Sequence, residues 1–145
     1  MDLPTNSVLL VEDDPDDVFF VKEAFKAAAP GMTIRVARDG EEAMSYLLGE
    51  DARADRLALV LLDLKLPRKS GLEVLEWCRS GGRAETVPII VLTSSQSDAD
   101  IRRAYELGAN SYLVKPIDAE AQRAMITALL AYWLGFNKVP ANSTL

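Results

Sequence analysis

The sequence predicts an α/β fold in which five parallel strands form one doubly wound sheet with helices on both faces, a (βα)5 arrangement. Short apolar runs alternate with amphipathic segments along the chain, and turn residues separate them. Regular alternation of this kind implies a single parallel sheet with right-handed crossovers. The run Leu57–Leu62 is apolar at every position, which is typical of a parallel strand covered on both faces.

Local patterns place each element. The predicted strands are Ser7–Val11, Thr33–Arg38, Leu57–Asp63, Val87–Leu92 and Ser111–Val114. The predicted helices are Asp16–Ala29, Gly40–Leu48, Gly71–Ser80, Asp98–Leu107 and Ala119–Trp133. Asp39 and Asp118 stand where N-cap residues are expected, and Gly108 follows the end of a helix. Gly49–Arg56 is expected to be a charged loop.

Composition is that of one globular domain. The chain has 145 residues, of which 49% are hydrophobic and 26% charged. We expect one domain over residues 1–145, with a core over about 7–133 and a tail from 134 to 145. The net charge of −6 argues against a nucleic-acid partner. No segment resembles a signal peptide or a membrane span, and the single cysteine, Cys78, suits a reducing cytoplasm.

Four of the predicted strands run directly into polar residues. Glu12 and Asp13 follow the first strand, and Asp63 ends the third. Thr93 follows the fourth strand, and Lys115 follows the fifth. Ligands of open α/β sheets bind beyond the carboxyl ends of the strands, near the point where the strand order reverses. We therefore expect these side chains to share one site, with Asp63 at its centre.

These residue types suit phosphoryl chemistry. Crowded carboxylates take up protons or a cation, and oxygen ligands without histidine or thiol select Mg²⁺, Ca²⁺ or Mn²⁺. The ammonium of Lys115 and the hydroxyl of Thr93 are suited to hold a phosphoryl group, and the carboxylate of Asp63 is a candidate nucleophile. Taken singly, each residue also fits a helix cap, a turn or an exposed lysine. It is the joint pattern that favours a site.

Four motifs occur in an order and spacing typical of one family: Leu9–Asp14, Leu61–Pro67 followed by Gly71, Val91–Ser94, and Lys115–Pro116. Over about residues 7 to 133 the chain resembles the receiver domain of two-component response regulators. The resemblance implies a flavodoxin-like receiver fold with strand order 2-1-3-4-5. It also implies a phosphoacceptor signalling protein, not an enzyme, whose phosphate is lost by slow hydrolysis.

The resemblance assigns roles to the residues at the strand ends. Asp63 would accept a phosphoryl group from a sensor histidine kinase. Glu12, Asp13, Asp63 and the backbone carbonyl of Lys65 would hold Mg²⁺, for which Mn²⁺ is a possible substitute.

Further roles concern the response to phosphate. Thr93 and Lys115 would contact the phosphoryl group, and Tyr112 would change rotamer together with Thr93. The Lys115–Pro116 peptide bond is usually cis in the family. Lys65 and Ser95 occupy positions that tune the lifetime of the phosphoryl group in relatives, so that lifetime stays open.

The chain is also similar to stand-alone regulators paired with bacterial and cyanobacterial phytochromes. The segments that carry this similarity are Gly49–Arg56, Leu66–Gly71 and Tyr132–Pro140. They imply a phytochrome-type histidine kinase as partner. Few residues follow the last predicted helix, so we expect output through a change of partner or of oligomeric state.

Three other functions share features with this sequence. A phosphatase with an aspartate nucleophile needs a second acid two residues later, where Lys65 stands. A flavodoxin-like cofactor binder needs a phosphate-cradling loop after the first strand, where Glu12–Asp17 would repel phosphate instead. A receiver-like interaction module that works without phosphorylation is not excluded by the motifs, although the full set of acids, hydroxyl and lysine argues against it.

The last predicted helix carries two apolar stripes. The stripe expected to face the sheet comprises Ala121, Ala124, Met125, Ala128, Leu129 and Tyr132. The second stripe comprises Ile126, Leu130, Trp133 and Leu134. Together with the tail, including Phe136, it is expected to form the contact of a symmetric homodimer. The alternative is that the second stripe packs under a loop or the folded-back tail.

Overall fold

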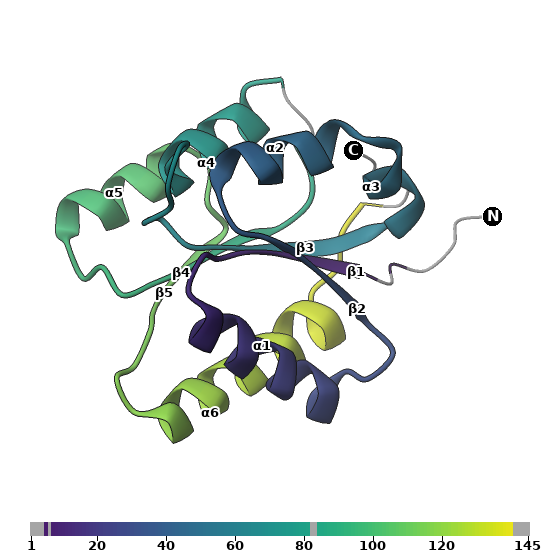
Figure 1. Ribbon diagram of the computed structural model, residues 1–145, viewed down its shortest axis with the longest axis vertical. Helices are drawn as coiled ribbons and strands as arrows, with labels where there is room; N and C mark the ends of the chain where they lie inside the picture. Colours follow the sequence, from purple (N-terminus) through teal and green to yellow (C-terminus); the bar gives the residue numbers. More distant parts are fainter. Residues whose placement is uncertain (1–4, 6, 82–83, 141–145) are drawn as a thin grey trace.

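The computed structural model describes residues 5, 7–81 and 84–140, and it contains a five-stranded parallel sheet with strand order β2-β1-β3-β4-β5 (Figure 1). The strands are β1 (Ser7–Val11), β2 (Thr33–Ala37), β3 (Leu57–Leu62), β4 (Ile89–Thr93) and β5 (Ser111–Val114). The predicted fold class and strand order are confirmed. β3 lies at the centre of the sheet, so its carboxyl end is flanked by the ends of β1 and β4.

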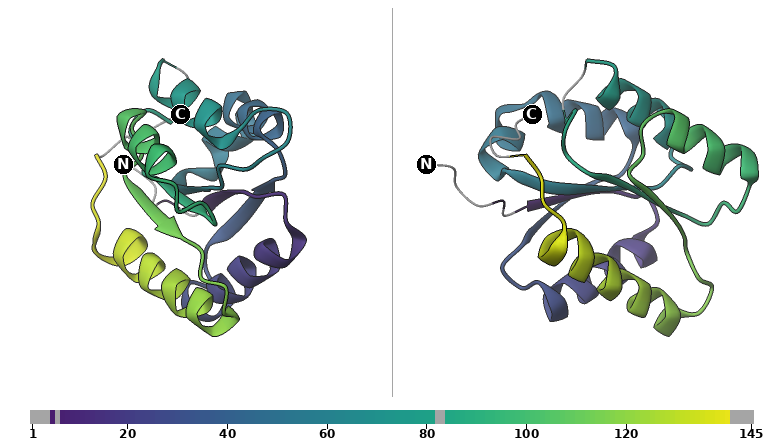
Figure 2. Two further views of the ribbon diagram at one scale, coloured as in Figure 1. Left: turned by 90° about the vertical axis from the view of Figure 1, so that its left-hand side faces the viewer. Right: turned by 180° about the vertical axis from the view of Figure 1, so that it is seen from behind.

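Helices cover both faces of the sheet. They are α1 (Pro15–Ala28), α2 (Gly40–Leu48), α3 (Glu50–Asp55), α4 (Gly71–Arg79), α5 (Asp98–Glu106) and α6 (Ala119–Leu130), followed by the π-helical segment η1 (Ala131–Phe136). Two views from different sides place α1 and α6 together on one face and α2, α4 and α5 on the other (Figure 2). The sheet is therefore the middle of three layers.

Alternation along the strands divides the core into two halves. In β1, Leu9 and Val11 join the cluster on the α2, α4 and α5 side, whereas Val8 and Leu10 join the cluster with α1 and α6. Cys78 of α4 is buried in the first cluster, as expected for a core residue. Burial raises the pKa of its thiol to about 11, which keeps the sulfur protonated and unreactive.

The boundaries of the helices follow from their caps. Asp39 and Asp118 accept hydrogen bonds from backbone amides in the first turns of α2 and α6, as predicted. The acidic residue that caps α1 is Asp14. Ser70 and Glu73 form a capping box at the start of α4.

One predicted loop is wrong. The segment Gly49–Arg56 contains the short helix α3 instead, which begins after Gly49 and ends at Arg56 in a left-handed conformation with φ of 51°. Ala52 in its first turn is fully buried. The high charge of this segment is typical of a loop. The small apolar side chain of Ala52 is nevertheless enough to pack a short helix against the core.

The assignment of the two stripes of α6 is also wrong. Ile126 and Leu130, expected at a dimer surface, are only 0% and 3% exposed, because they pack into the core beside α1. Tyr132, expected to face the sheet, is 52% exposed. Trp133 and Leu134 are partly buried against the same core, whereas Phe136 is 77% exposed. The buried positions of α6 are Gln122, Ile126, Leu129 and Leu130. Several small alanines stand on both sides of this helix, so spacing alone did not identify its inner face.

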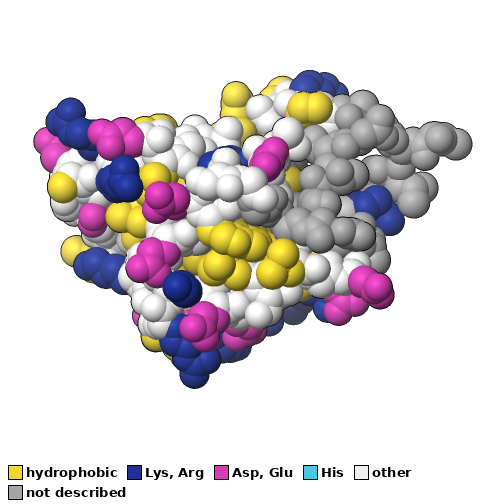
Figure 3. All heavy atoms as spheres, turned by 90° about the horizontal axis from the view of Figure 1, so that it is seen from above, with side chains coloured by type: hydrophobic (Ala, Val, Ile, Leu, Met, Phe, Trp, Pro, Cys, Tyr) yellow, Lys and Arg dark blue, Asp and Glu magenta, His cyan; other side chains and the backbone are white. Residues whose placement is uncertain are grey.

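The surface over α2, α4 and α5 is mixed. Figure 3, seen from that side, shows acidic and basic side chains scattered around a central hydrophobic patch. The large exposed hydrophobic side chains that the structure describes on these helices are Leu48 of α2 and Tyr105 of α5. Within the described residues, no helix combines the length and apolar character needed to cross a membrane.

The loop after β3 lies close to its neighbours. A Cβ atom added at Gly71 would lie 2.1 Å from the backbone oxygen of Asp63, and one added at Gly40 would lie 2.2 Å from the backbone oxygen of Lys69. Glycine at these positions lets the first turns of α4 and α2 pack directly on the loop that carries Asp63 and Lys65. The backbone around Asp63 is thereby fixed from two sides.

We expect Gly71→Ala to lower the free energy of unfolding by roughly 1–3 kcal/mol, because the added methyl group forces the backbone at Asp63 to move. Urea denaturation would measure the change. Gly31→Ala is the matched control, since nothing lies within 4 Å of a Cβ atom at that position. Equal effects of the two substitutions would contradict the close approach at Asp63.

Candidate functional site

The register of the central strands brings the predicted site residues together. Val11 of β1 is paired with Leu62 of β3, so Glu12 and Asp63 leave the sheet side by side. The amide of Asp63 donates a hydrogen bond of 3.0 Å to the carbonyl of Val11. On the other side, the amide of Lys115 donates to the carbonyl of Thr93 at 2.8 Å. The backbone ladder therefore positions the acids and the lysine at one edge.

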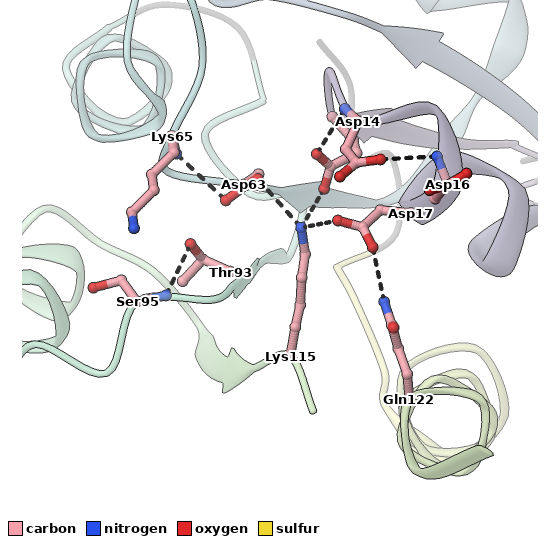
Figure 4. Close-up of polar contacts among 10 residues, drawn as sticks. Asp14, Asp16, Asp17, Asp63, Lys65, Thr93, Ser95, Lys115 and Gln122 are labelled. Atoms are coloured by element: carbon pink, nitrogen blue, oxygen red, sulfur yellow. Dashed lines mark hydrogen bonds and ion pairs between the residues drawn. The ribbon is translucent and has the colours of Figure 1, made fainter. Parts of the chain in front are cut away.

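The ammonium group of Lys115 lies among three carboxylates (Figure 4). Its Nζ atom is 2.5 Å from Oε1 of Glu12, 2.7 Å from Oδ2 of Asp17 and 3.2 Å from Oδ2 of Asp63. The side chain of Lys115 is only 9% exposed, so these contacts are largely shielded from water. The three acids share one ammonium, and the site keeps an excess of negative charge.

Three of the acids are arranged so that they can hold a cation. Oxygen atoms of Glu12, Asp13 and Asp63 lie within 4.8 Å of one another. Glu12 and Asp63 are buried, with 3% and 6% exposure, whereas Asp13 is exposed. An all-carboxylate donor set that is half open to water fits a hard divalent ion such as Mg²⁺ or Mn²⁺, which keeps part of its hydration shell.

The protonation equilibria reflect the crowding of charge. Burial raises the pKa of Glu12 to about 7, and the negative charge of Asp63 adds to this effect, although the hydrogen bond from Lys115 opposes it. Burial alone would lower the pKa of Lys115, but the contacts with Asp17, Glu12 and Asp63 outweigh it and raise that pKa. Lys115 therefore stays charged, and Glu12 is the acid that most easily takes up a proton.

The loop after β3 orients the carboxylate of Asp63. The amide of Lys65 donates to Oδ1 of Asp63 at 3.3 Å, while the side chain of Lys65 is exposed. Arg68 of the same loop has φ of 67° and donates to Oδ2 of Asp39 at 3.2 Å. Since Asp39 is the N-cap of α2, this ion pair ties the loop to the neighbouring helix.

Thr93 and Tyr112 belong to a second, adjoining network centred on Ser95. The amide of Ser95 donates to Oγ1 of Thr93 at 3.4 Å, and the hydroxyl of Tyr112 donates to the carbonyl of Ser95 at 2.9 Å. The Ser95 hydroxyl donates to Asp100 of α5 at 2.6 Å. Burial raises the pKa of the Tyr112 phenol, so its proton is available for this bond. Thr93 is fully buried at the edge of the site.

Sequence reasoning missed two members of the site, Asp17 and Gln122. Asp17 was interpreted only as part of an acidic segment, yet it lies in the first turn of α1, where its carboxylate contacts the ammonium of Lys115. Gln122 donates to Asp17 at 3.3 Å from the first turns of α6.

The expected cis bond at Lys115–Pro116 is wrong, because the described chain has no cis peptide. The two isomers of such a bond differ by only about 0.5–1 kcal/mol, so sequence decides poorly between them.

Comparison with known proteins identifies the family. The profile of the response regulator receiver domain matches residues 8–127. The chain belongs to the response regulator receiver family. Among curated receiver proteins, it is 40% identical over 134 residues to the probable methanogenesis regulatory protein FilR2 of Methanothrix harundinacea, covering 92% of this chain and 86% of the relative. It is 35% identical over 140 residues to the response regulator Rcp1 of Synechocystis, covering 95% of both chains.

Solved receiver structures agree with the fold. The crystal structure of the phosphorylated cyanobacterial phytochrome response regulator RcpA has a TM-score of 0.88 and 34% identity, covering 95% of this chain and 100% of RcpA. The Mn²⁺-bound form of Rcp1 has a TM-score of 0.86 and 35% identity, covering 94% of this chain and 99% of Rcp1. The receiver described above is thus similar to phytochrome response regulators over nearly its whole length.

We expect the affinity for Mg²⁺ to rise roughly tenfold between pH 6 and pH 8, because a cation has to displace the proton held by Glu12 at the lower pH. Isothermal titration calorimetry at several pH values would measure this dependence. Glu12→Gln cannot take up that proton, so the same titration should give a flatter profile in this variant. An equally steep profile in Glu12→Gln would show that another group titrates.

Proposed function

We propose that Asp63 accepts a phosphoryl group from the phosphohistidine of a sensor histidine kinase in an Mg²⁺-dependent reaction. The observation that carries this proposal is the position of the Asp63 carboxylate. It is 6% exposed, lies beside the oxygen atoms of Glu12 and Asp13, and is 3.2 Å from the ammonium of Lys115. A carboxylate held between a cation site and a fixed ammonium suits attack on phosphorus.

The transfer is balanced in atoms and charge. An oxygen of Asp63 forms a bond to phosphorus as the bond between phosphorus and the kinase imidazole nitrogen breaks, and the bonding electron pair returns to that nitrogen. Glu12, Asp13, Asp63 and the Lys65 carbonyl would hold Mg²⁺, or Mn²⁺ in its place. The ion supplies charge compensation for the phosphoryl oxygens. The donor set of the site supports this assignment, and so does the Mn²⁺ in the Rcp1 structure.

The Ser95 network offers a route from phosphorylation to the surface. On the phosphorylated protein, the hydroxyl of Thr93 would donate a hydrogen bond to a phosphoryl oxygen. Ser95 follows Thr93 in the chain and holds both Tyr112 and Asp100, so movement of Thr93 would change the contacts of α5 and β5. We infer that the protein signals through a surface that these elements share, by a change of partner or of oligomeric state.

We infer further that the kinase is of the phytochrome type and that the reaction takes place in the cytoplasm. The similarity to RcpA and Rcp1 over 95% of this chain supports the kinase class. The single cysteine, buried and free, fits a reducing compartment. The role is that of a switch, not of an enzyme with its own turnover.

We also propose that the protein forms a homodimer. The second stripe of α6 is largely buried, so the proposed contact is made by η1 instead. Tyr132 and Phe136 are 52% and 77% exposed and lie on consecutive turns of the same segment. Large exposed aromatic side chains at the end of a helix suit the centre of a two-fold symmetric contact.

Asp63→Asn is expected to abolish phosphate uptake, because the amide oxygen is a poor nucleophile, and to leave the fold intact. Incubation with radiolabelled phosphorylated kinase and Mg²⁺, followed by a hydroxylamine challenge, would measure acyl phosphate directly. Asp51→Asn, an exposed acid on α3, is the control and should label like the wild type. Hydroxylamine-sensitive labelling that persists in Asp63→Asn would contradict the acceptor assignment.

If η1 forms the dimer contact, Phe136→Ser should raise the dimer dissociation constant roughly tenfold or more, as truncation of an interface aromatic does. Sedimentation velocity over a concentration series would measure it. Leu48→Ser removes a 56% exposed hydrophobic side chain on α2 and serves as the control. A weaker dimer in Leu48→Ser and an unchanged one in Phe136→Ser would place the contact elsewhere.

A further inference from the structure

Gln122 is a polar residue inside the buried stripe of α6. It is 4% exposed, and it stands in helical register with Ile126, Leu129 and Leu130, which pack into the core. A buried amide without a partner costs roughly 1–3 kcal/mol, so an apolar side chain would serve packing better at this position. The partner that the amide finds therefore indicates why a glutamine stands there.

That partner is Asp17, which connects Gln122 to the phosphoryl site. Nε2 of Gln122 donates to Oδ1 of Asp17 at 3.3 Å, and Oδ2 of the same carboxylate lies 2.7 Å from Nζ of Lys115. Figure 4 shows Asp17 of α1 between the ends of the other two side chains, Lys115 after β5 and Gln122 of α6. The two oxygens of Asp17 thus have different partners, one on each side.

Asp17 competes with Asp63 for the ammonium of Lys115. Glu12 is the nearest carboxylate, at 2.5 Å from the Nζ atom. Of the two aspartates that contact this atom, Asp17 at 2.7 Å is nearer than Asp63 at 3.2 Å, although Asp17 is outside the predicted cation site. A phosphoryl group on Asp63 would need the same ammonium. Any charge interaction that holds Lys115 at Asp17 must be weakened before Lys115 can compensate the phosphoryl oxygens.

We propose that Asp17, oriented by Gln122, is a positioning residue that restrains Lys115 and thereby limits how tightly the site holds a phosphoryl group. This inference rests on the proposed function, because it concerns the occupancy of the same site. It adds a route by which the packing of α6 against α1 sets the stability of the phosphorylated state. A small displacement of α6 would change the orientation of the Asp17 carboxylate, and with it the freedom of Lys115.

The test uses beryllofluoride, which takes the place of a phosphoryl group on a carboxylate, at fixed Mg²⁺ and fluoride. We expect Asp17→Asn to bind it more tightly than the wild type by roughly threefold to tenfold, because Lys115 loses one of its three carboxylate partners and a nearby negative charge is removed. Titration followed by ¹⁹F NMR would give both the affinity and the resonance positions of the bound fluorides. The resonance of the fluoride nearest Lys115 should shift.

Asp16→Asn separates contact from overall charge. Asp16 is exposed and lies one residue away on the same turn of α1, and its hydrogen bond to Asp14 is donated by its backbone amide. The substitution removes the same charge without releasing Lys115. If Asp16→Asn tightens binding as much as Asp17→Asn, or if Asp17→Asn binds no more tightly than the wild type, the inference is overturned.

Gln122→Leu tests the orienting role through coupling. The leucine keeps the volume of the side chain in the core but cannot hold Asp17, so we expect tighter beryllofluoride binding than in the wild type, by a smaller factor than in Asp17→Asn. In the Asp17→Asn background the same substitution should change the affinity no further. An equal change of beryllofluoride affinity in both backgrounds would show that Gln122 acts only through packing and does not orient Asp17. A wild type that binds no beryllofluoride at all would instead overturn the proposed function.

Discussion

The organisation of this protein depends on one ammonium group that is shared by two buried carboxylates and one partly buried carboxylate. Glu12, Asp17 and Asp63 all contact Lys115, and Asp13 adds a further acid at the open side. Without Lys115, carboxylates this close at the end of a buried strand would repel one another or take up protons. The remaining negative charge of these acids favours a divalent cation at the same place. In the proposed function, stability, metal affinity and phosphoryl chemistry are therefore linked through a single side chain.

The sheet supplies the precision that this arrangement needs. Asp63 continues the central strand, and its backbone amide donates a hydrogen bond to the carbonyl of Val11 in β1. Gly71 allows α4 to pack directly against the Asp63 carbonyl, and Lys65 orients the carboxylate from the loop. Rigid elements thus set the position of the Asp63 carboxylate, the proposed phosphoryl acceptor.

The sequence predicted those features of the fold that depend on the periodicity of strands and on the capping residues of helices. The convergence of Glu12, Asp63 and Lys115 follows from the alternation of strands and helices, because the carboxyl ends of parallel strands share an edge. The strand order was expected only from the resemblance to receiver domains. The side of α6 that faces the core could not be predicted in this way. Alanines stand on several sides of this helix, so tertiary packing decides which side is buried. Asp17 was missed because a carboxylate in the first turn of a helix is ordinarily a favourable charge near its N-terminus. Its role depends on Gln122, which is distant in sequence and adjacent only in the folded chain.

The dependence on Lys115 is tested most directly by the melting temperatures of the wild type and of Lys115→Met, each measured over a series of Mg²⁺ concentrations. Loss of the ammonium leaves buried carboxylates uncompensated, so Lys115→Met should be clearly less stable without Mg²⁺. Added Mg²⁺ should stabilise both proteins by mass action and recover more stability in the variant. A melting temperature that does not change with millimolar Mg²⁺ in either protein would contradict a cation site among these acids.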